Sequence, residues 1–236
     1  MDKKELASCI EQTEVAPNAK INSIILICQE AIRYNYGSIC VNPCNVPIAY
    51  TELNGSNVRI STVIGFPLGS STTETKIFEA VDAINKGADE VDLMLNIGDI
   101  KDGRYSKVCV EIADVVKSSK EEGKKINKDI IVKVILETCL LDDDEIENAC
   151  LCAKKAGADY IKTSTGFATP KGIDGNSLPN GASSYHVKLI RKIVGDSMGV
   201  EANGGIRSAR TARTMIEAGA SKIGTSSGST IIESWM

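Results

Sequence analysis

The chain has 236 residues, of which 42% are hydrophobic and 25% are charged. This composition is ordinary for a globular protein, and the length is sufficient for one α/β barrel with a substantial core. The formal net charge of -4 and the pI near 5.2 argue against nucleic acid or an anionic membrane as the main partner. No apolar run approaches the roughly 20 residues that span a bilayer. The first residues also lack the apolar core of a signal peptide, so we expect a cytoplasmic protein.

The chain alternates short apolar runs with longer amphipathic stretches from one end to the other. Strands are predicted at 8–13, 37–42, 57–64, 89–96, 130–137, 158–163, 198–202 and 221–225. Helical patterns between them include 73–86, 105–121, 142–156, 185–195 and 208–218. Eight such units predict a single-domain (β/α)8 TIM barrel over residues 1–236. The alternative is a doubly wound open sheet, which is weakened because no GxGxxG motif follows an early strand.

Two connections are irregular. The basic segment 124–128 is expected to be a solvated surface loop. The segment 169–184 is longer, contains several glycines and prolines, and follows the sixth predicted strand. In a barrel it lies on the face where active sites are built, as a lid, a substrate contact or a surface decoration.

Eight cysteines are present between residues 9 and 152. A chain of this length and regular pattern does not need disulfides, so we expect reduced thiols. Cys150 and Cys152 lie two apart in a predicted helix and point to different sides, and His186 is the only histidine in the sequence. No zinc or other metal site is therefore predicted.

Four predicted strands carry a charged residue on the face that should point into the barrel. Alternation places Asp92, Lys133, Lys162 and Glu201 opposite uniformly apolar sets that would pack against the helices. Buried charges must be paired or functional, so these residues form either a structural ion network or a catalytic site.

A buried lysine is a natural amine nucleophile for a carbonyl group. Desolvation and a neighbouring cation, here Lys133, would favour the neutral form of Lys162. Asp92 could then move protons during the addition of the carbonyl compound.

Three glycine-containing turns follow the last predicted strands, at 163–166, 203–207 and 224–228. Glycines let the backbone approach an anion, and barrels frequently bind phosphate in the loops after strands seven and eight. Together the turns predict a phosphate site, whereas each turn alone would be an ordinary connection. Arg207 either supports the phosphate or lies in solvent.

Six segments resemble the deoxyribose-phosphate aldolase family. They are SICVNP (38–43), TVIGFPLG (62–69), EVDLMLNIG (90–98), VKVILET (132–138), YIKTSTG (160–166) and IGTSSG (223–228). The resemblance covers nearly the whole chain in the right order. It implies a (β/α)8 barrel lyase of carbohydrate degradation that reversibly cleaves 2-deoxy-D-ribose 5-phosphate to acetaldehyde and glyceraldehyde 3-phosphate, without metal or organic cofactor. A homodimer is also expected from the resemblance.

The resemblance also implies roles for individual residues. Lys162 matches the Schiff-base lysine, Asp92 the proton-relay aspartate and Lys133 a lysine near the site. The expected substrate-binding positions are Cys40, Thr165, Gly166, Gly204, Gly205, Gly224, Ser226 and Ser227.

The chain departs from the family pattern in three places near the pocket. Glu201 stands where the family carries a second active-site lysine, and Glu11-Gln12 replaces an Asp-His pair. The loop 170–182 is longer than usual. Glu201 could act as a general acid/base or pair with Lys133 or Lys162. These departures leave open a different sugar phosphate, another lyase or isomerase reaction, and a catalytically impaired sugar-phosphate-binding homologue.

Overall fold

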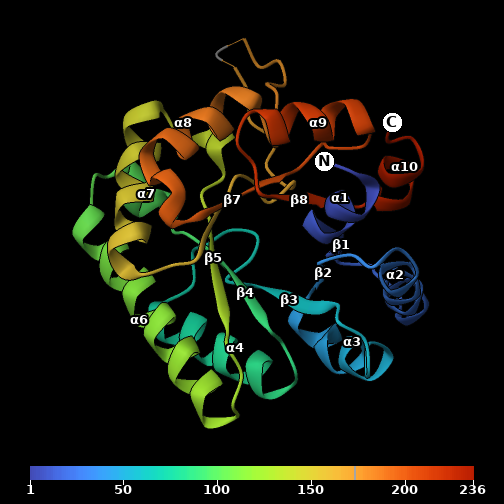
Figure 1. Ribbon diagram of the computed structural model, residues 1–236. Helices are drawn as coiled ribbons and strands as arrows, with labels where there is room; N and C mark the ends of the chain where they lie inside the picture. Colours follow the sequence, from blue (N-terminus) through green and yellow to red (C-terminus); the bar gives the residue numbers. More distant parts are fainter. Residues whose placement is uncertain (173) are drawn as a thin grey trace.

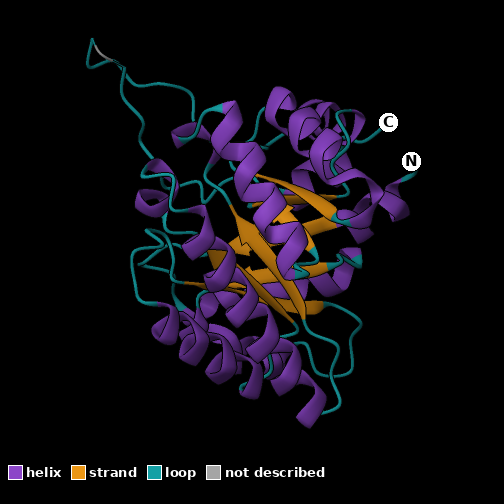
Figure 2. Cartoon of the chain, turned by 90° about the vertical axis from the view of Figure 1, so that its left-hand side faces the viewer, coloured by secondary structure: helices purple, strands orange, loops and turns teal. Residues whose placement is uncertain are grey.

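Eight parallel strands follow one another in sequence order and close into a barrel, with β1 paired to both β2 and β8 (Figures 1 and 2). The computed structural model describes residues 1–172 and 174–236. The strands are β1 (Ile10–Glu14), β2 (Ser38–Val41), β3 (Arg59–Ile64), β4 (Glu90–Met94), β5 (Ile131–Ile135), β6 (Tyr160–Lys162), β7 (Gly199–Asn203) and β8 (Lys222–Thr225). All eight predicted strands are confirmed, with ends that differ by a few residues, and the doubly wound alternative was wrong.

Helices surround the barrel and cover its outer face (Figure 2). They are α1 (Lys3–Cys9), α2 (Ile21–Tyr34), α3 (Val46–Glu52), α4 (Thr73–Asn85), α5 (Ile97–Lys101), α6 (Tyr105–Lys125), α7 (Asp143–Ala156), α8 (Ser184–Val194), α9 (Ala209–Glu217) and α10 (Gly228–Glu233). The five predicted helices correspond to α4, α6, α7, α8 and α9. Within the described residues no helix is both long and apolar enough to cross a membrane.

Local sequence explains where the helices begin and end. In α7, Asp142 accepts a hydrogen bond from the backbone N–H of Glu145, while Glu145 accepts one from the backbone N–H of Asp142. This capping box satisfies two N–H groups that lack partners inside the helix. The helix ends at Gly157, whose φ of 79° lies in the left-handed region that glycine adopts without a steric cost.

Alternation along the strands separates two environments. The outward side chains Val91, Leu93, Val132 and Val134 are fully buried in the apolar layer between strands and helices. The inward positions carry the charges, and strand register aligns them: Asp92 pairs with Lys133, and Lys162 pairs with Glu201. The predicted inward face is therefore confirmed for these four residues.

One expectation about a connection was partly wrong, and one about the cysteines was wrong. Residues 126–128 form the expected connection, but Lys124 and Lys125 do not belong to it, because α6 continues through them. Cys109 of α6 and Cys152 of α7 form a disulfide rather than two free thiols. The helices α6 and α7 pack against each other, so the side of α7 that carries Cys152 faces α6.

The loop after β6 leaves the barrel instead of closing over it. Lys171 pairs with Ser177, and the described residues on either side of residue 173 extend away from the body of the molecule (Figures 1 and 2). Residue 173 lies outside the described residues. The loop returns to the barrel where the Ala182 N–H donates to the carbonyl oxygen of Gly204 at 3.0 Å. The base of the loop therefore contacts a predicted phosphate turn.

Candidate active site

The four predicted charges from β4 to β7 meet inside the barrel. The Lys162 Nζ lies 2.5 Å from Asp92 Oδ2 and 2.8 Å from Glu201 Oε1. The Lys133 Nζ lies 3.3 Å from Asp92 Oδ1 and 3.0 Å from Glu201 Oε2. All four residues are at most 2% exposed. The strands thus hold two ammonium groups and two carboxyl groups in one buried cluster.

Three further charged residues complete this cluster and were not predicted as members. Glu11 of β1 lies 2.5 Å from Lys162 Nζ through its Oε1 and contacts Lys133 Nζ through its Oε2. Glu90 of β4 lies 2.7 Å from Lys133 Nζ and 2.6 Å from the Nζ of Lys222 on β8. Glu90 and Lys222 also occupy inward positions, so alternation could have identified them.

The charge balance around Lys162 differs from the sequence-based expectation. Burial lowers the pKa of Lys162, but the carboxylates of Asp92, Glu11 and Glu201 outweigh it and hold the pKa well above its usual value. Lys133 was expected to favour the neutral amine, and this was wrong because three carboxyl groups contact the same nitrogen. Lys162 therefore rests as an ammonium ion and must transfer a proton before it can act as a nucleophile.

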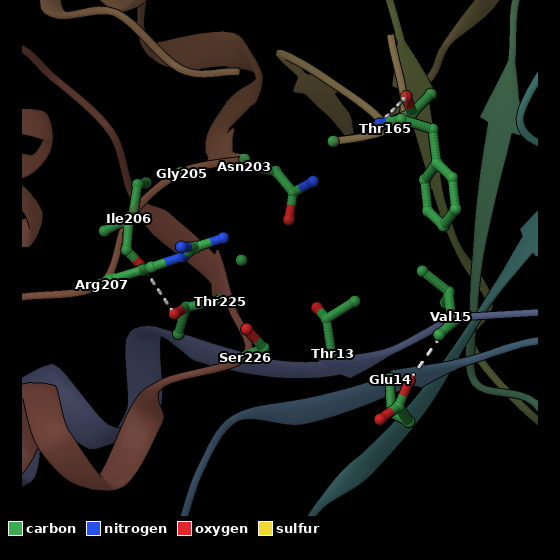
Figure 3. A pocket seen from close by; sticks show the side chains of 15 residues that line it. Thr13, Glu14, Val15, Thr165, Asn203, Gly205, Ile206, Arg207, Thr225 and Ser226 are labelled. Atoms are coloured by element: carbon green, nitrogen blue, oxygen red, sulfur yellow. Dashed lines mark hydrogen bonds between the residues drawn. The ribbon is translucent and has the colours of Figure 1, made fainter. Parts of the chain in front are cut away.

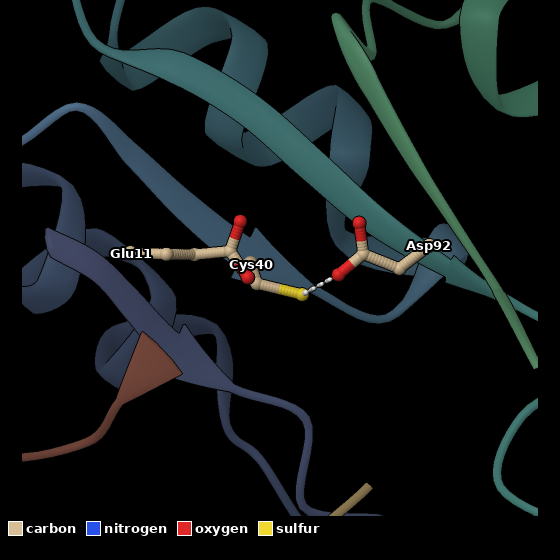
Figure 4. A group of neighbouring side chains, drawn as sticks. All are labelled: Glu11, Cys40 and Asp92. Carbon is tan, nitrogen blue, oxygen red and sulfur yellow. Dashed lines mark hydrogen bonds between the residues drawn. The ribbon is translucent and has the colours of Figure 1, made fainter. Parts of the chain in front are cut away.

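Cys40 of β2 also faces this cluster. Its Sγ lies 3.9 Å from Asp92 Oδ2, and it forms a close group with Asp92 and Glu11 (Figure 4). Three such side chains can in principle hold a metal ion. However, both carboxylates already contact the Lys162 ammonium group at 2.5 Å, and burial raises the pKa of the thiol well above its usual value. A protonated thiol and two neutralised carboxylates form a poor metal site.

A cavity of about 440 Å³ opens at the C-terminal ends of the strands (Figure 3). Six of the predicted substrate-binding residues line it: Thr165, Gly166, Gly204, Gly205, Gly224 and Ser226. Arg207 lines it as well, together with Thr13 and Glu14 at the end of β1, which were not predicted. The predicted Ser227 is not among the lining residues and instead precedes α10. Cys40 does not line it either, because it lies in the buried cluster.

The site and the fold together define a class. A closed (β/α)8 barrel carries buried lysines paired with carboxyl groups, and a mouth of glycine turns follows its last strands. Such a barrel is suited to an enzyme that handles a carbonyl compound with an anionic group.

The chain belongs to the DeoC/LacD family aldolases, whose family model matches residues 1–234. It is 49% identical over 230 residues to the deoxyribose-phosphate aldolase of Caldanaerobacter subterraneus subsp. tengcongensis, covering 98% of this chain and 93% of the relative. It is 48% identical over 235 residues to that of Thermococcus kodakarensis, covering 99% and 98%. Its structure is similar to that of the tetrameric Aeropyrum pernix enzyme, with a TM-score of 0.86 and 31% identity over 99% of this chain and 92% of the other. The predicted family and barrel fold are thus confirmed.

Proposed function

We propose that this protein is a deoxyribose-phosphate aldolase, an aldehyde-lyase that cleaves 2-deoxy-D-ribose 5-phosphate to acetaldehyde and D-glyceraldehyde 3-phosphate. The names of the relatives at 48–49% identity support this activity. The structural observation that carries it is the Lys162 Nζ at 2.5 Å from Asp92 Oδ2, inside a barrel whose mouth is built from glycine turns.

Lys162 is the proposed nucleophile. After losing a proton, its nitrogen attacks the aldehyde carbon of the open-chain sugar, and loss of water gives an iminium ion. Removal of the proton from the 3-hydroxyl group breaks the C2–C3 bond and releases glyceraldehyde 3-phosphate. The remaining enamine takes up a proton at C2, and hydrolysis then releases acetaldehyde.

Asp92, Lys133 and Glu201 are the proposed supporting groups. Asp92 is close enough to Lys162 to accept and return protons. Lys133 contacts both Asp92 and Glu201 and limits the repulsion between the carboxyl groups. Glu201 occupies the position of the family's second lysine, and it contacts both lysines of the site.

The mouth of the barrel is the proposed phosphate site. Gly166, Gly204, Gly205 and Gly224 let the backbone approach the phosphate oxygens, and the Ser226 hydroxyl can donate a hydrogen bond. Arg207 is exposed and lines the same cavity, so it adds a positive charge at the entrance. No metal or organic cofactor has a role in this scheme.

One observation favours a second candidate function. Three carboxyl groups contact Lys162, and one of them, Glu201, stands where the family pattern has a second lysine, so we infer that proton transfer at Lys162 differs from the family pattern. The same barrel would then act on another sugar phosphate, or bind one with little turnover. Activity toward a panel of phosphorylated aldoses separates these outcomes.

Trapping of the covalent intermediate tests the proposal directly. The protein is incubated with acetaldehyde or deoxyribose 5-phosphate, treated with borohydride and examined by peptide mass spectrometry. We expect an adduct on Lys162 that is lost in Lys162→Met. Lys188→Met is the control, because Lys188 is an exposed lysine of α8 and its replacement leaves every buried ion pair in place. An intact protein without any adduct on Lys162 would refute the Schiff-base mechanism.

The assembly and cellular location are proposals of the same kind. We infer that the chain acts as one domain and as a cytoplasmic homodimer, as its family resemblance implies. Light scattering on the purified protein measures the mass of the assembly. A monomer or tetramer would contradict the homodimer.

A further inference from the structure

Glu11 and Glu201 reach the same two lysines from different strands. Each directs its Oε1 to Lys162 and its Oε2 to Lys133. The Glu201 distances are 2.8 Å to Lys162 and 3.0 Å to Lys133, and Glu11 Oε1 lies 2.5 Å from Lys162. The two carboxyl groups are neighbours, because their Oε1 atoms contact the same Lys162 nitrogen and their Oε2 atoms contact the same Lys133 nitrogen. Both residues are fully buried.

Gly224 of β8 leaves room for this arrangement. It is paired with Glu11 in the register of β1 and β8, so it lies between the two glutamates around the barrel. A Cβ atom at this position would stand 2.9 Å from Glu201 Oε1 and 2.1 Å from Asn203 Oδ1. The absence of a side chain here thus allows Glu201 to turn toward Glu11 and the lysines.

The charges of the cluster do not balance if every group is ionised. The groups that face one another are the ammonium groups of Lys133, Lys162 and Lys222 and the carboxyl groups of Glu11, Glu90, Asp92 and Glu201. The remaining cation, Arg59, is half exposed and approaches Glu90 only to 3.9 Å. Cys40 also faces the cluster as a thiol. One additional proton makes the buried set neutral, and burial strongly favours neutrality.

The environment of Glu201 identifies the group that holds this proton. Burial and the neighbouring Glu11 charge raise the pKa of Glu201 to about 7, although Lys133 and Lys162 oppose the change. The pKa of Glu11 moves the other way, because three lysines outweigh the effect of its burial. Both Glu201 oxygens lie within 3.0 Å of a lysine nitrogen, but neither of these contacts has the geometry of a hydrogen bond. Within the described residues, both oxygens therefore lack a hydrogen-bond donor. A proton on Glu201 would satisfy one of these oxygens through Glu11.

We propose that Glu11 and Glu201 share one proton at neutral pH, and that this pair makes Glu11 a further catalytic residue that exchanges protons with the Lys162 nitrogen. The inference rests on the proposed Schiff-base function of Lys162. In this mechanism Lys162 becomes a nucleophile through proton transfer inside a neutral cluster, and a neighbouring cation is not required.

The proton balance of the first half-reaction closes within the pair. The Lys162 ammonium group gives one proton to the Glu11 carboxylate, and the free amine attacks the aldehyde carbon. Glu201 protonates the former carbonyl oxygen and receives a proton from the nitrogen, which leaves a neutral carbinolamine. Glu201 then protonates the hydroxyl group, the C–O bond breaks and water leaves. The products are an iminium ion and a pair that again holds one proton, so no outside acid or base is required.

Infrared spectroscopy can detect the shared proton without relying on activity. In wild-type protein near pH 6 we expect a carboxylic-acid C=O band that disappears as the pH rises through about 7. The band should be lost in Glu201→Gln and in Glu11→Gln, while Glu147→Gln, at an exposed position of α7, retains it. A wild-type spectrum without the band, or a band that survives in both pair variants, would overturn the proposal.

The pH dependence of covalent trapping tests whether the pair takes part in the reaction. The rate at which acetaldehyde is trapped on Lys162 should fall by up to tenfold per pH unit above about pH 7 in wild-type protein. Glu201→Gln and Glu11→Gln should trap more slowly and lose this decline. Unchanged decline in both variants contradicts the catalytic role of the pair while leaving the proposed aldolase intact. If no acetaldehyde is trapped on Lys162 at any pH, the proposed function is refuted, and the catalytic role of the pair is refuted with it. The infrared band still decides whether Glu11 and Glu201 share a proton.

Discussion

The carboxylate of Glu137 holds Thr165 through two groups at once. Its Oε2 accepts a hydrogen bond from the Thr165 N–H at 3.2 Å and a second from the Thr165 hydroxyl group. The same hydroxyl oxygen accepts from the Phe167 N–H at 2.9 Å. Glu137 is 2% exposed and adopts a left-handed backbone conformation with φ of 56°. A non-glycine residue in this region is uncommon, so Glu137 is well placed as a positioning residue for the turn after β6.

Glu137→Ala should weaken substrate binding more than the chemical step. A hydrogen bond to a charged group contributes about 1.5–3 kcal/mol, so we expect KM for deoxyribose 5-phosphate to rise roughly tenfold or more with a smaller change in kcat. Steady-state kinetics measures both constants, and Glu137→Gln should recover part of the loss. Glu217→Ala, at an exposed position of α9, is the control. Equal loss of kcat and no rise in KM would contradict a positioning role.

Strand alternation was sufficient to predict most of the fold and four of the seven residues in the charged cluster. Asp92, Lys133, Lys162 and Glu201 alternate with buried apolar residues in strands of three to five residues, so their direction followed from sequence alone. Glu11 was noticed only as a departure from the family pattern. Its contacts depend on the closure of β1 against β8, which joins residues more than 200 positions apart.

The electrostatic state of the site could not be predicted in the same way. Sequence indicates that Lys133 lies near Lys162, but the direction of the pKa change depends on how many carboxyl groups reach the nitrogen. The disulfide could not be predicted from the sequence for a similar reason. Whether Cys109 can meet Cys152 depends on the rotation of α6 against α7, and the hydrophobic pattern of each helix fixes this rotation only coarsely.

The buried pair Lys76–Glu111 predicts a pH-dependent stability defect. Lys76 Nζ lies 2.7 Å from Glu111 Oε1 and is fully buried outside the barrel. Burial lowers the pKa of Lys76, and the hydrogen bond and charge of Glu111 oppose this. Glu111→Gln removes this charge and weakens the hydrogen bond, so the free energy of unfolding should fall by about 3–5 kcal/mol at neutral pH.

This defect should shrink as the pH rises. The folded variant loses the Lys76 proton at lower pH than the unfolded chain does, so the unfolded state binds more protons and stability increases with pH in that interval. Urea unfolding at several pH values up to about 10, the range of an ordinary lysine, measures the trend. A double variant, Lys76→Met with Glu111→Leu, should show no such increase of stability with pH. A defect that is constant with pH would contradict the assignment.

The disulfide between Cys109 and Cys152 should stabilise the outer layer of helices. It closes a sequence separation of 43 residues, for which chain entropy predicts about 4 kcal/mol. Cys152→Ser, or reduction, should therefore lower the midpoint of urea unfolding, while Cys44→Ser should not, because Cys44 is an exposed free cysteine. Thiol titration of the unfolded, unreduced protein should find six free thiols. A count of eight would show that the bridge does not form.

Glu201→Lys tests whether a cation can replace the proton of the Glu11–Glu201 pair. A lysine here would place positive charge beside Lys162 and remove one of the three carboxyl groups that raise its pKa. We therefore expect the pKa of Lys162 to fall, since a like charge disfavours the ammonium form. The decline of trapping rate above about pH 7 should disappear, because the proton responsible for it is absent. Activity in the alkaline range should then equal or exceed that of the wild type. The pH profile of kcat measures this outcome, and a variant that folds but retains the wild-type decline would show that another group controls the reaction.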